Sequence, residues 1–303
     1  MRKQNFWSYF MSHYLLYVML FPPILYYTLF HYGPMSGLLM AFKHYNMFRG
    51  LWASEWAGLD IFREIFRMPE FFRSIRNTLT LNLLDLVLGF PAPVILALML
   101  NELVNGKFKK AIQTILYMPH FLSWVIIGGM VYQIFATNNG LINVVLGDLI
   151  GVKIPFLTNN WWWIFTYFTI GLWQSVGFSA IIYMAAISSI DQEIYEAARV
   201  DGCSRFRMMW QITLPCIAST IVVMFILRVG SMASIGFEKP LMLGNAMVYS
   251  VSDVLSTFVY RVGVVNGRFS IGTGIGFVQS LVNFLLVVCA NMLSHRISGE
   301  SLW

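Results

Sequence analysis

The sequence predicts an all-α, polytopic membrane protein with about six transmembrane helices. Of its 303 residues, 58% are hydrophobic and only 11% are charged, whereas soluble domains carry about 25% charged residues. Its charge-free stretches reach the roughly 20 apolar residues that a helix needs to cross a bilayer. The chain therefore has too little charge to cover a water-facing surface, and lipid is its expected solvent.

Six apolar stretches predict the membrane spans, and no internal repeat or separate soluble domain interrupts them. The first stretch predicts an uncleaved span, because no small-x-small cleavage pattern precedes Gly33-Pro34. We therefore expect a single transmembrane domain over residues 1–303. The predicted spans are about 13–32, 78–100, 112–135, 162–188, 209–235 and 273–294.

Positive charges predict the orientation of the chain. Arg2 and Lys3 at the N-terminus, three lysines in 101–110 and three arginines in 189–215 fall on one side of a six-span bundle. Short cytoplasmic loops are enriched in Lys and Arg, so both termini are expected in the cytoplasm. The long loop 33–76 is also basic but interleaves acidic residues, and it falls outside.

The outward-facing loops are expected at 33–76, 136–161 and 236–272. Within the first, residues 60–76 are amphipathic and predict one helix lying along the interface. The run Trp161-Trp162-Trp163 predicts an interfacial anchor at the start of the fourth span, because tryptophan is enriched there. An aromatic carbohydrate platform is the alternative for this run.

Several function classes lack support in the sequence. The net charge is +6, but the basic residues are spread over loops with no zinc-ligand or RNA-binding pattern, so nucleic acid is not expected as a partner. The three cysteines form no CxxC pair, and the five histidines show no metal-ligand spacing. Neither a metal site nor a catalytic cluster is predicted.

The segment 189–215 carries the most informative pattern, Glu196-Ala-Ala-Arg-Val-Asp-Gly202 followed by Ile212-Thr-Leu-Pro215. Residues 190–200 predict a short helix, and Gly202 is a natural left-handed helix stop. A second helix follows, and Pro215 is expected to break it before the fifth span. Such a helix–turn–helix with exposed apolar groups predicts a docking partner.

This pattern resembles the EAA motif of binding-protein-dependent ABC importer permeases. Gly202 stands six residues and Pro215 nineteen residues after Glu196, as in the motif, while Cys203 replaces a residue that is commonly Ala. In that family the loop is a coupling helix seated in a groove of the nucleotide-binding subunit. The resemblance assigns ATPase coupling to Glu196, Ala197, Ala198, Asp201, Gly202, Ile212, Leu214 and Pro215.

The resemblance extends along nearly the whole chain to one branch of the sugar permeases, which includes the permeases of alginate and other polysaccharide or oligosaccharide importers. It implies a type I ABC importer permease fold in the bacterial cytoplasmic (inner) membrane. It also implies a second permease, two ATPase subunits and an external solute-binding protein as partners. The segments that carry it are Phe90-Pro-Ala-Pro93, 97–102, 118–124, 181–186 and Gly236-Phe-Glu238.

This chain has no GxxxxGK[ST] phosphate loop. We therefore expect it to be no enzyme and to bind no cofactor of its own. ATP and Mg²⁺ belong to the expected partner ATPases.

Polar side chains inside the spans are candidates for the substrate pathway, because ionisable groups are costly in a membrane. Arg228 would suit a uronate-containing saccharide. The alternative is that Asp85 and Arg228 only hold the helices together. Ser231 and Ser234 are expected on one face of the fifth span, and Gln279 and Asn283 on one face of the sixth. The candidates for the pathway are Asp85, Trp173, Gln174, Tyr183, Arg228, Ser231, Ser234, Gln279 and Asn283.

Two other classes of function compete with an importer permease for oligo- or polysaccharides, acidic ones included. A secondary transporter or channel explains the spans and buried charges but leaves the loop around Glu196–Gly202 unexplained. A membrane-embedded enzyme would need a catalytic cluster.

Overall fold

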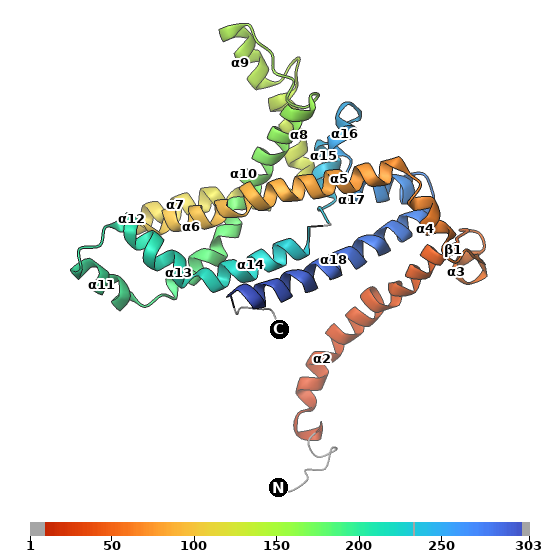
Figure 1. Ribbon diagram of the computed structural model, residues 1–303, viewed down its shortest axis with the longest axis horizontal. Helices are drawn as coiled ribbons and strands as arrows, with labels where there is room; N and C mark the ends of the chain where they lie inside the picture. Colours follow the sequence, from red (N-terminus) through yellow and green to blue (C-terminus); the bar gives the residue numbers. More distant parts are fainter. Residues whose placement is uncertain (1–9, 233, 299–303) are drawn as a thin grey trace. The chain divides into compact units, whose positions relative to one another are not determined.

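The computed structural model (Figure 1) describes residues 10–232 and 234–298, and these are almost entirely helical. The prediction for Arg2 and Lys3 lies outside the described residues. The chain divides into two compact units. One comprises Met1–Arg67 with Val262–Phe277, and the other comprises Met68–Arg261 with Val278–Trp303.

The first unit begins with a long apolar helix. α2 (Tyr14–Tyr27) continues through the π-helical turn η1 (Thr28–Tyr32) and the 3-10 segment η2 (Gly33–Phe42). The sequence predicted an end near residue 32. The helical path continues because Gly33 keeps right-handed helical angles, with φ −54° and ψ −52°.

A small hairpin follows in the same unit, where β1 (Lys43–His44) pairs antiparallel with β2 (Glu55–Trp56) around α3 (Gly50–Ala53). Next come α4 (Asp60–Ile65) and, later in the chain, the start of α18 (Phe269–Ser298). The Ser270 hydroxyl accepts from the Tyr45 N–H at 3.0 Å and donates to the Lys43 carbonyl at 2.7 Å. Arg268 also pairs with Glu64, so both ends of the unit are fastened together.

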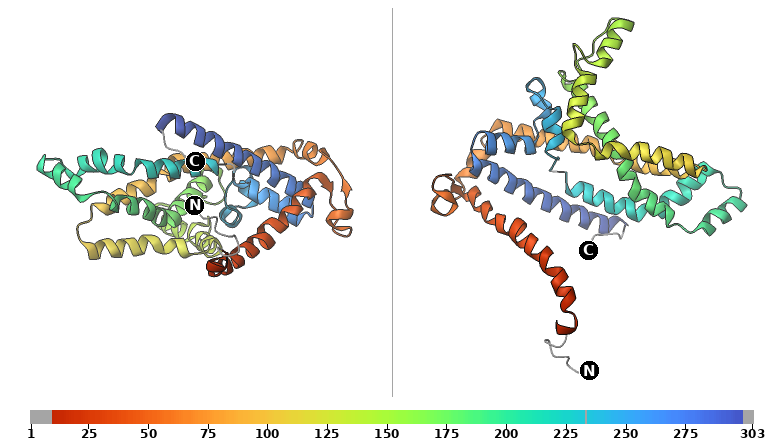
Figure 2. Two further views of the ribbon diagram at one scale, coloured as in Figure 1. Left: turned by 90° about the horizontal axis from the view of Figure 1, so that it is seen from below. Right: turned by 180° about the vertical axis from the view of Figure 1, so that it is seen from behind.

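The second unit packs around α10 (Asn160–Ser188), which contacts α6 (Pro91–Asn101), α7 (Gly106–Tyr117) and α14 (Ala218–Gly230) (Figures 1 and 2). The unit contains further elements. They are α5 (Pro69–Leu84), η3 (Asp85–Gly89), η4 (Met118–Phe121), α8 (Trp124–Phe135), α9 (Leu141–Ile150), α11 (Gln192–Val200), α12 (Arg205–Met208), η5 (Met209–Thr213), α13 (Leu214–Cys216), α15 (Glu238–Leu243), η6 (Ala246–Val248), α16 (Tyr249–Ser252) and α17 (Leu255–Val259). After α17, the chain continues through η7 (Tyr260–Val265) into the first unit.

The amphipathic stretch 60–76 is not one interfacial helix, as the sequence predicted. α4 ends at Ile65, and a new helix, α5, begins at Pro69 and runs to Leu84. Met68 between them is extended, with φ −82° and ψ 116°, because the proline ring disfavours a helical conformation of the preceding residue.

Two predicted spans are bent rather than straight. Gly106–Phe121 and Trp124–Phe135 meet at 100°, and Arg205–Cys216 and Ala218–Gly230 meet at 62°. As the sequence predicted, the second pair breaks close to Pro215. The bend lies at Ile217, two residues after this proline, which itself stands in the first turn of α13. By length and composition, four helices of the described chain can cross a membrane, or up to six if each bent pair is one span.

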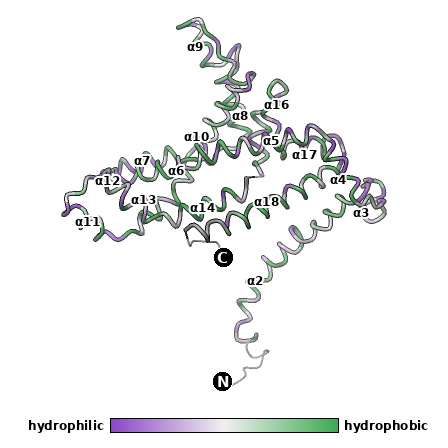
Figure 3. Tube along the Cα trace, viewed as in Figure 1, coloured by the Kyte–Doolittle hydropathy of each residue, from purple (hydrophilic) through white to green (hydrophobic). Residues whose placement is uncertain are grey.

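Hydrophobic and hydrophilic residues are distributed unevenly over the helices (Figure 3). Hydrophobic residues run along α14 and α18, and hydrophilic residues gather around α11. The apolar helix faces are largely exposed in the isolated chain, as expected for helices solvated by lipid.

The three consecutive tryptophans, 161–163, lie in different surroundings. Trp161 is 80% exposed, but Trp163 is 1% exposed and packs in a cluster with Ile127, Val131 and Leu243. The indole N–H of Trp163 donates to the Leu243 carbonyl at 2.8 Å. Neighbours on a helix point in directions about 100° apart, so the prediction of a common anchor is wrong for Trp163.

Close packing of α10 on α7 depends on Gly177, where a methyl group would collide with the backbone carbonyl of Leu116. We expect Gly177→Ala to lower the free energy of unfolding by about 1–3 kcal/mol, the usual cost of overpacking. Thermal or denaturant unfolding of the purified protein in detergent measures this. Gly129→Ala on α8 is the matched control, because nothing lies within 4 Å of its new methyl group. Equal effects of both substitutions would contradict the packing argument.

Candidate functional site

Two cavities meet inside the second unit, and four residues line both of them: Asp85, Trp124, Arg228 and Lys239. Cavity A, of about 630 Å³, is lined further by Leu81, Asn82, Tyr167, Phe168 and residues 234–238. Cavity B, of about 600 Å³, is lined further by Gly89, Phe90, Pro93, Gly171, Leu172, Gln174, Ser175, Phe178, Ser179, Ile182, Tyr183, Met224, Leu227 and Ser231. We call the four shared residues the junction.

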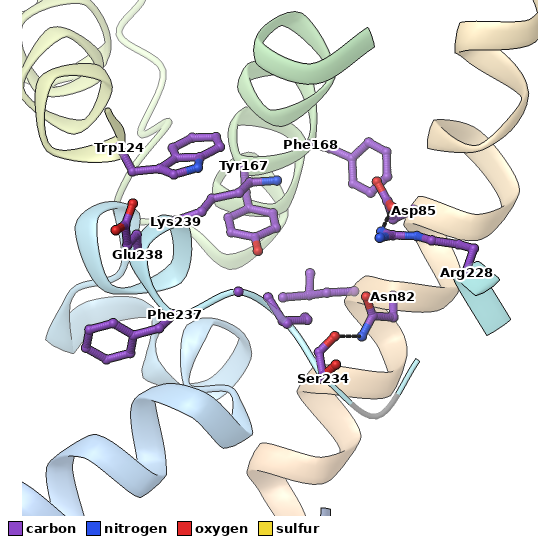
Figure 4. A pocket seen from close by; sticks show the side chains of 13 residues that line it. Asn82, Asp85, Trp124, Tyr167, Phe168, Arg228, Ser234, Phe237, Glu238 and Lys239 are labelled. Atoms are coloured by element: carbon purple, nitrogen blue, oxygen red, sulfur yellow. Dashed lines mark hydrogen bonds and ion pairs between the residues drawn. The ribbon is translucent and has the colours of Figure 1, made fainter. Parts of the chain in front are cut away.

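The ion pair between Asp85 and Arg228 lies in the junction (Figure 4). Asp85 is the first residue of η3, whose π-helical hydrogen bond runs from the Phe90 N–H to the Asp85 carbonyl at 2.8 Å. A methyl group at Gly89 would collide with the Asp85 carboxylate, so this glycine makes room for the pair. Turns of this kind are frequent at functional sites.

A second cation, Lys239, enters the junction from α15, outside the membrane-spanning segments. Its Nζ lies 3.7 Å from the ring centroid of Tyr167 and 5.6 Å from that of Trp124, and Figure 4 shows these three side chains together. Burial, as the larger cause, and the positive charge of Arg228 together lower the pKa of Lys239 to about 7. No acidic side chain among the described residues forms an ion pair with it.

Asn82 ties the segment after α14 to α5. Its amide donates to the carbonyls of Met232 at 2.7 Å and Ser234 at 3.1 Å. The sequence predicted that Ser231 and Ser234 share a face of the fifth span, but α14 ends at Gly230 and Ser234 lies beyond it. Ser234 still reaches cavity A through this segment, and Ser231 lines cavity B.

The remaining pathway candidates fall into two groups. Gln174 and Tyr183 line cavity B, where the Gln174 amide donates to the His120 carbonyl at 3.4 Å. Trp173 is 42% exposed and lines neither cavity. Gln279 and Asn283 on α18 also line neither of these two cavities.

The sequence analysis missed Lys239, Trp124, Tyr167 and Asn82 as site residues. Lys239 stands in a segment that was predicted to be an outer loop, although it directly follows the Gly236-Phe-Glu238 motif. Trp124 ends another of the resembling segments, and no polar pattern marks it. The motifs therefore signalled the right neighbourhoods, but only the fold brings these side chains together.

The segment 189–215 forms two short helical arms joined by a capped turn. The Asp191 carboxylate accepts from the Glu193 N–H at the start of α11. Gly202, with φ +76°, ends the turn, and the Cys203 N–H donates to the Ala198 carbonyl at 2.9 Å. This is the bond of a Schellman motif, which closes a helix with a left-handed residue.

The two arms of this turn are also joined by side chains. The Tyr195 hydroxyl on α11 is 2.9 Å from the Thr213 hydroxyl on η5. Ala198 is buried, whereas Glu196 and Ala197 are exposed, and Glu196 forms no ion pair with a described residue. Ile212, Leu214 and Pro215 belong to the second arm, in η5 and α13. The turn is thus a firmly joined unit with polar and apolar groups on its outside.

The bent helices, the central cavities and the capped turn are the features expected of a multi-pass permease. The chain belongs to the family of binding-protein-dependent transport system inner membrane components, whose model matches residues 71–299. The predicted class of protein is therefore confirmed, and the chain is an inner-membrane permease of an ABC transporter.

Individual relatives are similar over nearly the full chain. Protein LplB of Bacillus subtilis is 43% identical over 288 residues, which cover 95% of this chain and 91% of LplB. The polygalacturonan/rhamnogalacturonan transport system permease protein YteP, from the same organism, is 42% identical over 95% of this chain and 90% of its own length.

Solved structures of similar proteins confirm the predicted importer permease fold. A bacterial ABC transporter involved in the import of the acidic polysaccharide alginate matches with a TM-score of 0.89 and 40% identity, covering 97% of this chain and 100% of the other. The alginate ABC transporter in complex with an alginate pentasaccharide-bound periplasmic protein matches with the same TM-score and 39% identity, over 99% and 100%.

The Asp85–Arg228 pair can be tested by a double-mutant cycle. Asp85→Asn and Arg228→Gln each leave one charge without its partner, so the double variant is expected to lose less stability than the sum of both. Because the side chains are 37% and 41% exposed, we expect a coupling of about 1 kcal/mol. Denaturant unfolding in detergent measures it.

The exposed pair Asp60–Arg63 on α4 serves as the control cycle. An i,i+3 pair on a helix surface couples by only about 0.3–0.5 kcal/mol. Additive effects of Asp85→Asn and Arg228→Gln, with no coupling above that of the control, would refute a structural role of the junction pair.

Proposed function

We propose that this chain is one of two permease subunits of an ATP-driven importer for oligo- or polysaccharides. The observation that carries the proposal is the pair of adjoining cavities, which combine aromatic faces with amide, hydroxyl and charged groups. Pyranose rings stack on aromatic side chains, and their hydroxyls exchange hydrogen bonds with amides and hydroxyls. The polysaccharide transport named for YteP and for the matching alginate transporter supports the same substrate class.

In this proposal the saccharide passes through cavities A and B, and the junction separates them. Asp85, Gln174, Tyr183, Arg228, Ser231 and Ser234 contribute to the lining, as does Lys239. The external partner is a solute-binding protein, as the family description and the alginate-bound periplasmic protein of the matching complex suggest. A second permease completes the pathway.

The turn between α11 and α12 couples the chain to two partner ATPases, which bind ATP and Mg²⁺. Large apolar side chains exposed on this segment support docking: Val200 is 87%, Phe206 69% and Trp210 51% exposed. The Tyr195–Thr213 bond would transmit movement of α11 to η5 and onward to α14. In this proposal the turn and both termini lie in the cytoplasm.

Affinity purification of this chain from its native membrane, followed by mass spectrometry, tests the proposed assembly. We expect recovery of an ATPase, a second permease and a solute-binding protein, because the proposed importer requires all three as partners of this chain. Recovery of the chain alone after crosslinking would favour a secondary transporter or channel.

Gly202→Asp tests the coupling role of the turn. An L-residue at φ +76° costs about 1–2 kcal/mol locally, and the new carboxylate would face the docked ATPase. We expect saccharide uptake by proteoliposomes to fall while ATP hydrolysis and membrane insertion persist.

Gly151→Asp is the matched control, because Gly151 ends α9 with φ +67° and also has nothing within 4 Å of an added methyl group. It lies far along the chain from the turn and should leave the ratio of uptake to hydrolysis unchanged. Normal uptake by Gly202→Asp would refute the coupling role.

A further inference from the structure

We propose that Lys239 is a carboxylate-binding residue at the junction of cavities A and B, which makes the pathway selective for saccharides that carry uronate groups. The inference rests on the proposed saccharide import and adds a specificity-determining residue to it.

Arg228, the cation that the sequence analysis suggested for this role, is already neutralised. It pairs with Asp85 in the junction, so the charge of Asp85 already balances its own. The charged residues that line cavity B are Asp85, Arg228 and Lys239. When Lys239 is protonated, cavity B therefore has one positive charge in excess, and Lys239 carries it.

Glu238 does not supply the missing counter-charge. It lines cavity A but not cavity B, and it is exposed. Within the part of the chain that the structure describes, Lys239 forms neither an ion pair nor a hydrogen bond. When it is protonated, its ammonium group can therefore donate hydrogen bonds to a ligand.

The surroundings hold the ammonium in place without neutralising it. Its contacts to the rings of Tyr167, at 3.7 Å, and Trp124, at 5.6 Å, are cation–π interactions, which attract the cation but accept no proton from it. Gly171 on α10 provides the space, because a methyl group there would collide with Nζ of Lys239. The position of this cation is thus built into two helices.

A uronate unit matches this arrangement in shape and charge. Its ring has an apolar face that can stack on Trp124, Tyr167 or Phe168, and its carboxylate is an acceptor for the ammonium. A neutral hexose in the same place would take up space around the ammonium without pairing it. Buried polar groups left unpaired are costly, and such costs are a strong source of discrimination.

Binding to the purified permease–ATPase complex in detergent tests the inference, with the solute-binding protein left out so that only selection at the permease is measured. The probes are a galacturonate trisaccharide and the same trisaccharide with its carboxylates reduced to alcohols. We expect the wild-type complex to bind the acidic form about tenfold or more tightly, since hydrogen bonds to charged groups contribute about 1.5–3 kcal/mol.

Three variants separate charge from packing. Lys239→Met should remove the preference for the acidic form, and Lys239→Arg should keep most of it. Lys153→Met, at an exposed lysine outside both cavities, is the control and should leave the preference unchanged. If Lys239→Met does not assemble, Gly171→Ala displaces the ammonium while keeping its charge, and it should lower the preference too.

An unchanged preference in Lys239→Met, or in Gly171→Ala, would overturn the inference, because Lys239 would then only pack against Tyr167. Equal binding of both trisaccharides by the wild type would overturn it as well but leave saccharide import intact. Binding of neither trisaccharide, together with no saccharide uptake by the complete transporter in proteoliposomes, would overturn the proposed function itself.

Discussion

The ion pair between Asp85 and Arg228 is the interaction on which the rest of the site depends. It joins η3, between α5 and α6, to the last turn of α14. A charge left unpaired at membrane depth is costly, so each residue requires the other. The π-helical turn at Asp85 and the space at Gly89 allow the two side chains to meet. The pair also decides which cation of the junction stays uncompensated, and this is Lys239.

α14 connects this junction to the proposed coupling turn. Arg228 lies near its C-terminal end, while its N-terminal end follows α13 and η5, which the Tyr195–Thr213 bond ties to α11. Between them the helical path bends by 62° at Ile217. A movement of α11 would thus reach the junction along one continuous stretch of backbone, so import and coupling would share a single mechanical element.

Much of the fold and of the capped turn could be predicted from local sequence. Apolar stretches specify helices in lipid. Gly202 specifies a left-handed end of the helix, because glycine is the residue type without the Cβ atom that clashes at positive φ. The predictions were wrong where the packing of distant segments, rather than the local sequence pattern, determined the surroundings of a side chain. Trp163 is buried despite its exposed neighbours, and Ser234 reaches cavity A from beyond the end of α14.

A multi-pass membrane protein, most of its helices and the two charges that a membrane makes costly could be predicted from composition or from neighbours within a few residues. The permease class rested on the resemblance of its motifs to a family. The pairing of Asp85 with Arg228, and the place of Lys239 beside Trp124 and Tyr167, became visible in the folded chain. These residues come from separate helices, and their meeting depends on side-chain volumes such as those absent at Gly89 and Gly171. No local pattern encodes a contact of that kind.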